Sequence, residues 1–294
     1  DNVSQVVNNL ITISKLVPLA LFIAIGIFFI NGANFTPVFP QDIYVDGSFA
    51  QAAVLLFFAY TGFEVIAIAA EDMKNPKKNL PRAIIMCMLL VSILYMAILA
   101  VSIGVLGTDL ANTKAPVQDA FNVIVGPIGM YIVLIGTLIS MGGINFAEAY
   151  YAPRVATSMA EDGMLPSALA KRNRYNAPYV AAIVTAIASV LLAWSGSFTT
   201  LAAISAVSRF TQYLPTCLAV IIFRRKWADK ARSYTIPGGY LIPVIAIGTS
   251  LWMLAQAQTN QLLWGLGGCI IILPFYYSYW KKKKAGLIKD HNEM

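Results

Sequence analysis

Charged residues are scarce in this chain of 294 amino acids. They account for 12% of the sequence, whereas hydrophobic residues account for 58%. A soluble domain carries roughly a quarter charged residues, so the composition excludes an ordinary soluble domain and predicts an integral membrane protein. The net charge of +7 does not indicate nucleic-acid binding, because the basic residues fall in short loops between apolar runs.

Histidine and cysteine are rare as well. The single histidine, His291, lies in a polar tail, which argues against a histidine-based metal site or catalytic triad. The three cysteines, Cys87, Cys217 and Cys269, lie inside apolar runs, without metal-ligand spacing and with no sign of a disulfide framework. We therefore expect neither an enzyme nor a resident metal or cofactor.

Long apolar runs are what the sequence does contain. A bilayer is spanned by about 20 apolar residues in a helix, and eight runs come close to that length. We expect an all-α membrane protein whose residues 1–294 form one transmembrane domain. The predicted helices span residues 10–30, 49–70, 83–106, 127–151, 180–194, 201–223, 241–257 and 262–280.

The loop charges predict the orientation of these helices. Eighteen of the 21 basic residues follow the second, fourth, sixth and eighth runs, whereas Lys114 is the one basic residue in the alternate loops. Loops rich in Lys and Arg face the cytoplasm. Both ends of this chain are therefore expected to be cytoplasmic.

The second apolar run, residues 49–70, has polar and flexible residues near its centre. Glu64 lies there beside Thr61 and Gly62, and an acid at membrane depth is costly and commonly marks a transport pathway or proton relay. A neighbouring glycine lets the backbone leave helical geometry and expose its polar groups. One interpretation is a helix broken near residues 60–64 that lines a small-molecule site. The other is a continuous helix with a packing glycine and a paired glutamate.

Two basic residues and one small-residue cluster also lie within the apolar runs. Lys15 either extends to the membrane surface or acts as a fixed cation inside the bundle, and Arg209 needs a polar partner that the sequence does not identify. In the fourth run, Ser140, Gly142 and Gly143 either allow close helix packing or, with Asn145, offer polar groups to a site.

Two further helical features are predicted outside the long runs. Pro116 favours the start of a short helix across the outer face between the third and fourth runs, and the alternative is a plain loop. The fourth helix is expected to continue through Thr157 and to stop at Gly163 and Pro166.

Four short motifs carry a family resemblance. They are FAYTGFE at residues 58–64, AEDMKNP at 70–76, LPR at 80–82 and MAEDGMLP at 159–166. With these motifs at this spacing, the chain resembles the amino acid–polyamine–organocation (APC) superfamily of transporters.

The resemblance implies a particular fold. In this superfamily two five-helix inverted repeats are followed by two extra C-terminal helices, and the substrate site lies at the bilayer midplane beside broken helices. The resemblance covers the fifth to the twelfth helix. The eight helices expected here would be part of that fold, with the first four helices absent and the chain truncated at its N-terminus.

The resemblance also implies a set of substrate-binding residues. Phe58 looks like the aromatic gate that closes over the substrate. The backbone of Phe58, Ala59 and Thr61 looks like the part that receives the substrate ammonium group. Tyr60, Gly62 and Met141 complete the substrate-facing candidates, and because these side chains are neutral they favour neutral amino acids.

Three residues resemble the coupling machinery of the family. Lys15 looks like the lysine that many members place where sodium-coupled relatives bind sodium. Glu64 and Tyr95 resemble a carboxylate–tyrosine pair used in proton coupling, although many members carry Asp where this chain has Glu64.

The function implied is secondary active transport. The resemblance predicts a multi-pass permease of the plasma membrane that moves neutral amino acids by alternating access, coupled to protons. The alternative is an obligate amino acid exchanger, because the sequence does not separate the two modes. The expected partners are an amino acid, a proton and the lipid bilayer, with no nucleic acid, and the sequence does not indicate whether an accessory subunit binds.

Overall fold

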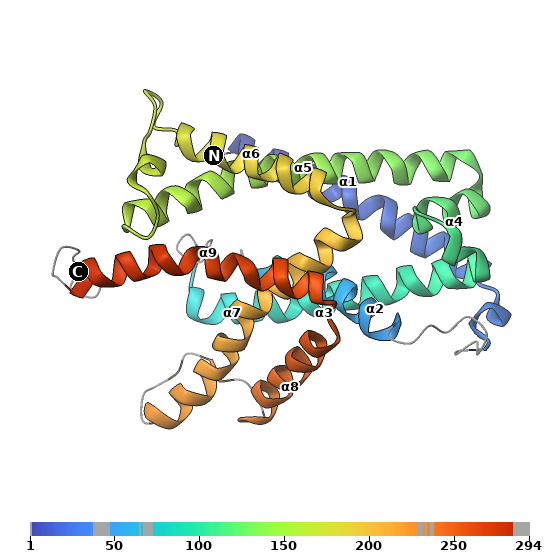
Figure 1. Cartoon of the computed structure of the whole chain (residues 1–294). Coiled ribbons are helices and arrows are strands. Elements are labelled where there is room, and N and C mark those ends of the chain that lie inside the picture. The colour runs from blue at the N-terminus through green and yellow to red at the C-terminus, as the bar shows by residue number, and fades with distance from the viewer. Residues whose placement is uncertain are drawn as a thin grey trace. The chain divides into compact units, whose positions relative to one another are not determined.

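The computed structural model is all-helical over the residues that it describes, which are 2–37, 48–64, 66, 73–228, 232, 234–235 and 238–284 (Figure 1). No strand occurs within these ranges. The α-helices are α1 (Asn2–Gly26), α2 (Ser48–Ala59), α3 (Pro76–Leu106), α4 (Pro116–Val125), α5 (Pro127–Glu161), α6 (Tyr179–Ser195), α7 (Phe198–Lys226), α8 (Leu241–Gln256) and α9 (Thr259–Lys284). Short 3-10 helices are η1 (Ile27–Phe29), η2 (Gly32–Phe35), η4 (Gly107–Asn112) and η5 (Ser167–Ala170).

Five stretches of the described chain are long and apolar enough to cross a membrane. They are Ile11–Phe29, Pro76–Asn112, Pro127–Glu161, Phe198–Lys226 and Thr259–Lys281. The other three predicted runs correspond to shorter apolar helices, α2, α6 and α8, of 12, 17 and 16 residues. The all-helical membrane class is therefore confirmed. The end of the predicted second run and part of the motif at 70–76 lie outside the described residues.

Two predicted helix boundaries are confirmed. α4 begins with Pro116 at its first turn, where the missing N–H of proline costs nothing. α5 runs to Glu161, and Gly163 follows in the left-handed region with φ +78°. The N–H of Gly163 donates to the Ala160 carbonyl (3.0 Å) and the N–H of Met164 to the Met159 carbonyl (2.8 Å). This pair of bonds is the Schellman motif, which satisfies carbonyls at a helix end.

The chain divides into two compact units. Unit 1 comprises residues 1–44 and 86–150, and unit 2 comprises residues 45–85 and 151–294. In unit 1 the buried core joins Phe22 of α1, Val101 of α3 and Phe121 of α4. The rings of Phe22 and Phe121 meet edge to face at 5.7 Å, a geometry that aromatic pairs favour.

Unit 2 is built around α7, which packs against α2, α8 and α9 (Figure 1). Small buried residues on α7, Ala203 and Ala206, face Val54 of α2. Phe57 of α2 stacks on Phe210 of α7 with ring centroids 4.7 Å apart. Because small side chains let α2 approach α7 closely, the end of α2 is fixed against α7. That end is where the candidate site begins.

Candidate functional site

α2 ends in a tight turn. The helix stops at Ala59, and the N–H groups of Tyr60 and Thr61 donate to the carbonyls of Phe57 (3.1 Å) and Phe58 (3.0 Å). Gly62 follows with φ +103°, a conformation that residues with a Cβ rarely adopt. Of the two interpretations of this run, a helix broken near residues 60–64 and a continuous helix, the first places the break where this turn lies.

The Phe58 carbonyl accepts two hydrogen bonds within this turn. Besides the N–H of Thr61, the Thr61 hydroxyl donates to it at 2.7 Å. A carbonyl oxygen has two lone pairs, so Thr61 satisfies both. Any ligand that uses the Phe58 carbonyl must therefore displace a Thr61 group.

The Phe58 side chain lies partly buried between α2 and the first turn of α7. Its ring meets that of Phe198 edge to face, with centroids 6.2 Å apart. Phe58 also packs against the core formed by Val54, Ala203 and Ala206. Phe58, the expected gate residue, thus contacts Phe198 of α7 in this structure.

Glu64 is held by three groups of unit 2. Its carboxylate forms an ion pair with Arg209 of α7. It accepts a hydrogen bond from the Tyr213 hydroxyl at 3.0 Å and another from the N–H of Gly62 at 3.0 Å. Glu64 therefore ties the turn after α2 to α7.

No partner for Arg209 was predicted from the sequence, and Tyr213 was not predicted as a site residue. These two residues are four apart on α7, so they lie on one face of the helix. The side chains of Glu64 and Arg209 are 20% and 30% exposed within the structure. The spacing of Arg209 and Tyr213, together with the rule that charges at membrane depth are paired, is a signal that points to an acid such as Glu64.

The other expected site residues belong to unit 1. Lys15 and Met141 line one cavity of about 130 Å³ between α1 and α5. The remaining lining residues are Pro18, Leu19, Val133, Gly136, Thr137 and Ser140. Tyr95 lies partly buried on α3. The structure thus groups Lys15 with Met141 and Ser140, and it groups Phe58–Glu64 with Arg209 and Tyr213.

Small residues on α5 set how closely α1 approaches it. A Cβ on Gly136 would lie 2.6 Å from the ring of Pro18 and 3.1 Å from the Ser14 carbonyl oxygen, and a Cβ on Gly143 would lie 2.7 Å from Ile11. Around Gly142, in contrast, the space is open. Gly136 and Gly143 therefore serve helix packing, and Gly136 lines the Lys15 cavity.

The described residues contain no group of three or more His, Cys, Asp or Glu side chains arranged to hold a metal ion. The groups that the described part of the site presents are backbone N–H and carbonyl groups, the Glu64–Arg209 ion pair and the hydroxyls of Thr61 and Tyr213.

The sequence of this chain is similar to a family model and to several known transporters. A family model described as amino acid permease matches residues 2–275. The branched-chain amino acid permease BcaP of Bacillus subtilis is 30% identical over 286 residues, which cover 95% of this chain and 60% of that protein. The serine/threonine exchanger SteT of the same organism is 28% identical, with 95% and 65% covered. The methylthioribose transporter of that organism is 29% identical, with 84% and 53% covered. The chain thus spans between about half and two-thirds of the length of these relatives.

Proposed function

Because the chain belongs to the amino acid permease family, we propose that it forms part of a secondary active transporter that moves neutral amino acids across the plasma membrane by alternating access. The observation that carries this proposal is the turn at Tyr60–Gly62, where α2 stops between Phe58 and the Glu64–Arg209 ion pair. Irregular backbone at membrane depth is tolerated where it lines a cavity or is buried in protein.

The substrate ammonium is assigned to the backbone around Phe58, Ala59 and Thr61. Carbonyl oxygens suit an ammonium group because they are acceptors without a full charge. Phe58 then covers the substrate by leaving its contact with Phe198. Tyr60, Gly62 and Met141 remain proposed substrate-facing residues.

Neutral substrates fit the residues proposed for the site. Arg209 compensates the charge of Glu64, so the pair leaves no unbalanced side-chain charge to select a charged substrate. Two relatives, a branched-chain amino acid permease and a serine/threonine exchanger, are also named for neutral amino acids.

Proton coupling is assigned to Glu64, Tyr95 and Lys15. The contacts of Glu64 with Arg209 and Tyr213 support this role, because they connect its carboxylate to α7. Protonation of Glu64 would remove its charge and so change the interactions that hold α7. Lys15 supports the coupling role by placing an ammonium group on the cavity that Met141 also lines. The alternative is an obligate exchanger, a mode that the name of the serine/threonine relative favours.

The test is uptake of labelled neutral amino acids into proteoliposomes that contain the full-length protein. Accumulation into vesicles without internal amino acid, driven by an outside-acid gradient, is the expected result. Uptake that requires preloaded amino acid and ignores the gradient would establish exchange instead. No uptake of any amino acid in either condition would refute the proposed function.

A further inference from the structure

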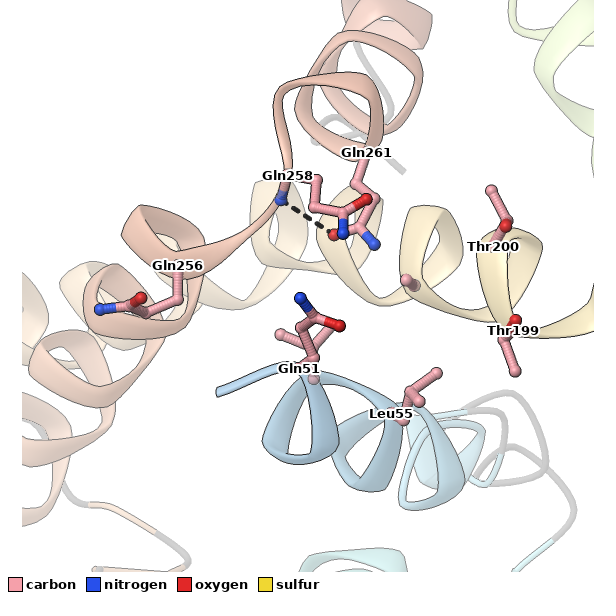
Figure 2. Close-up of a pocket in the computed structure, with 9 residues that line it drawn as sticks. Gln51, Leu55, Thr199, Thr200, Gln256, Gln258 and Gln261 are labelled. Atoms are coloured by element: carbon pink, nitrogen blue, oxygen red, sulfur yellow. Dashed lines mark hydrogen bonds between the residues drawn. The ribbon is translucent and has the colours of Figure 1, made fainter. Parts of the chain in front are cut away.

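A second, polar cavity lies in unit 2, away from the Glu64 cluster. It has a volume of about 160 Å³, many times the roughly 10–15 Å³ that one water molecule needs. It lies between the first turns of α2 and α7 and the turn that joins α8 to α9 (Figure 2). Its lining residues are Gln51, Val54, Leu55, Thr199, Thr200, Ala203, Gln256, Gln258 and Gln261. This cavity has room for a small solute as well as for water.

The lining is polar but carries no charge. Four glutamines and two threonines line it together with the apolar residues Val54, Leu55 and Ala203. Each amide offers both donors and an acceptor, and each hydroxyl offers one donor and two acceptor positions. No lining side chain could balance the charge of a lone ion. The cavity therefore suits a small polar molecule without net charge.

Several of these polar groups are fixed by local hydrogen bonds. The Gln261 side chain accepts from the backbone N–H of Gln258 at 3.1 Å (Figure 2). This bond resembles the returning half of a capping box, and it leaves the Gln261 amide N–H groups as donors. The Ser197 hydroxyl lies 3.1 Å from the Thr199 hydroxyl and 2.9 Å from that of Thr200. Three of the six polar side chains, those of Gln261, Thr199 and Thr200, are thus held before a ligand arrives.

The cavity is next to the proposed gate. Phe198, whose ring contacts that of Phe58 at 6.2 Å, directly precedes Thr199 in the chain. Val54 and Leu55 lie about one turn before Phe58 on α2. Both α7 and α9 begin at this cavity and end in basic residues. The cavity therefore lies at the ends of these helices opposite the basic, cytoplasm-directed ends.

We propose that this cavity is an acceptor site where a zwitterionic amino acid binds before it passes Phe58. The proposal rests on the proposed function, because it takes the transported amino acid as the ligand. A zwitterion has no net charge but carries strong donors and acceptors, which the amides and hydroxyls can pair. Its carboxylate faces the amide N–H groups, and its ammonium faces the amide and hydroxyl oxygens.

The test is protection of a cysteine placed in the cavity of the full-length protein. Gln258→Cys is introduced after Cys87, Cys217 and Cys269 are replaced by alanine, and the labelling rate with a membrane-impermeant thiol reagent is measured with L-serine or with glycerol. At a serine concentration of twice the dissociation constant, occupancy slows labelling about threefold. Glycerol, a polyol of similar size without charged groups, is expected to leave the rate unchanged.

Variants separate this site from the central one. Gln51→Met with Thr200→Val removes hydrogen-bonding groups from the lining, and we expect protection by serine to disappear. Thr249→Val is the matched control, because the Thr249 hydroxyl bonds only to carbonyls of its own helix at 3.0 and 3.1 Å; protection should remain. In Phe58→Ala, protection should also remain while uptake falls.

Three results would overturn the acceptor site: no protection by serine, equal protection by glycerol, or protection that vanishes in Phe58→Ala. Labelled serine uptake is measured on the same preparations. Absence of protection in Gln258→Cys without further lining changes, while its uptake is intact, contradicts only the acceptor site. Protection in Gln258→Cys together with no uptake by the unaltered protein contradicts the proposed transport while leaving the binding site standing.

Discussion

At the scale of single residues, the Glu64–Arg209 pair is the most informative contact. An isolated charge at membrane depth is costly, and each of these residues lies within a predicted apolar run. The structure joins them across the chain and adds the Tyr213 hydroxyl and the Gly62 N–H to the same carboxylate. The two opposite charges thus pair with each other within unit 2.

A double-mutant cycle measures this pair. Glu64→Gln and Arg209→Met should each destabilise the protein, because each leaves a partly buried charge without its partner. The double variant should regain part of that loss, with a coupling of about 0.5–3 kcal/mol. The measurement is the free energy of unfolding of the full-length protein in mixed micelles.

The Glu161–Arg172 pair provides a matched control for that cycle. It joins the same residue types at 2.9 Å, but its side chains are 48% and 40% exposed. Exposed pairs contribute about 0–1 kcal/mol. A coupling for Glu64–Arg209 no larger than that of Glu161–Arg172 would contradict the assignment of a structural tie between the turn and α7.

Gly62 allows a second test at this scale. Its φ of +103° is a strained conformation for any residue with a Cβ, so Gly62→Ala should cost about 1–3 kcal/mol. Gly248→Ala in α8 is the control, because the space around Gly248 is open and alanine favours a helix by about 1 kcal/mol over glycine. Thermal unfolding should shift in opposite directions for the two variants, and equal shifts would contradict the strained turn.

At the scale of helices, the close approach of α1 to α5 positions the Lys15 cavity. Gly136→Ala places a methyl group against the Pro18 ring and the Ser14 carbonyl, which cannot move aside as a flexible side chain would. Overpacking of this kind costs about 1–3 kcal/mol. We expect lower thermal stability and reduced uptake, because the wall that carries Lys15 is displaced.

Gly142→Ala is the matched variant on the same helix. The space around Gly142 is open, so alanine there should leave stability unchanged or raise it slightly. Equal changes in thermal stability for Gly136→Ala and Gly142→Ala would contradict close helix packing as the reason for glycine at position 136.

The helices themselves were largely predictable from sequence, because long apolar runs and stop signals are local features. Gly163 marked the end of α5, and Pro116 marked the start of α4. The pairing of Arg209 and Tyr213 with Glu64 was not predictable, because 145 residues separate Glu64 from Arg209 in the chain and no local pattern records which helices pack together. For Gly143 the sequence allowed two interpretations, helix packing and a role in a site. The structure favours packing, because a Cβ on Gly143 would lie 2.7 Å from Ile11.

At the scale of the whole molecule, the loop charges predict the orientation. In a cysteine-free background, Asn112→Cys should react with an impermeant thiol reagent on intact cells, and Lys171→Cys should react only after the cells are permeabilised. Both positions are exposed in the structure, so lack of labelling would not arise from burial. The reverse pattern would show that the predicted orientation is wrong.

The bond between the Thr61 hydroxyl and the Phe58 carbonyl (2.7 Å) has a consequence for a transporter. In the proposed site the Phe58 carbonyl also accepts a hydrogen bond from the substrate ammonium group. The Thr61 hydroxyl therefore competes with the substrate for this carbonyl. An arriving ammonium group gains only the difference between its own bond and the one it replaces. In the proposed site, Thr61 would thereby limit how tightly a substrate is held and would return to the carbonyl as the substrate leaves, an arrangement that would favour rapid turnover over high affinity.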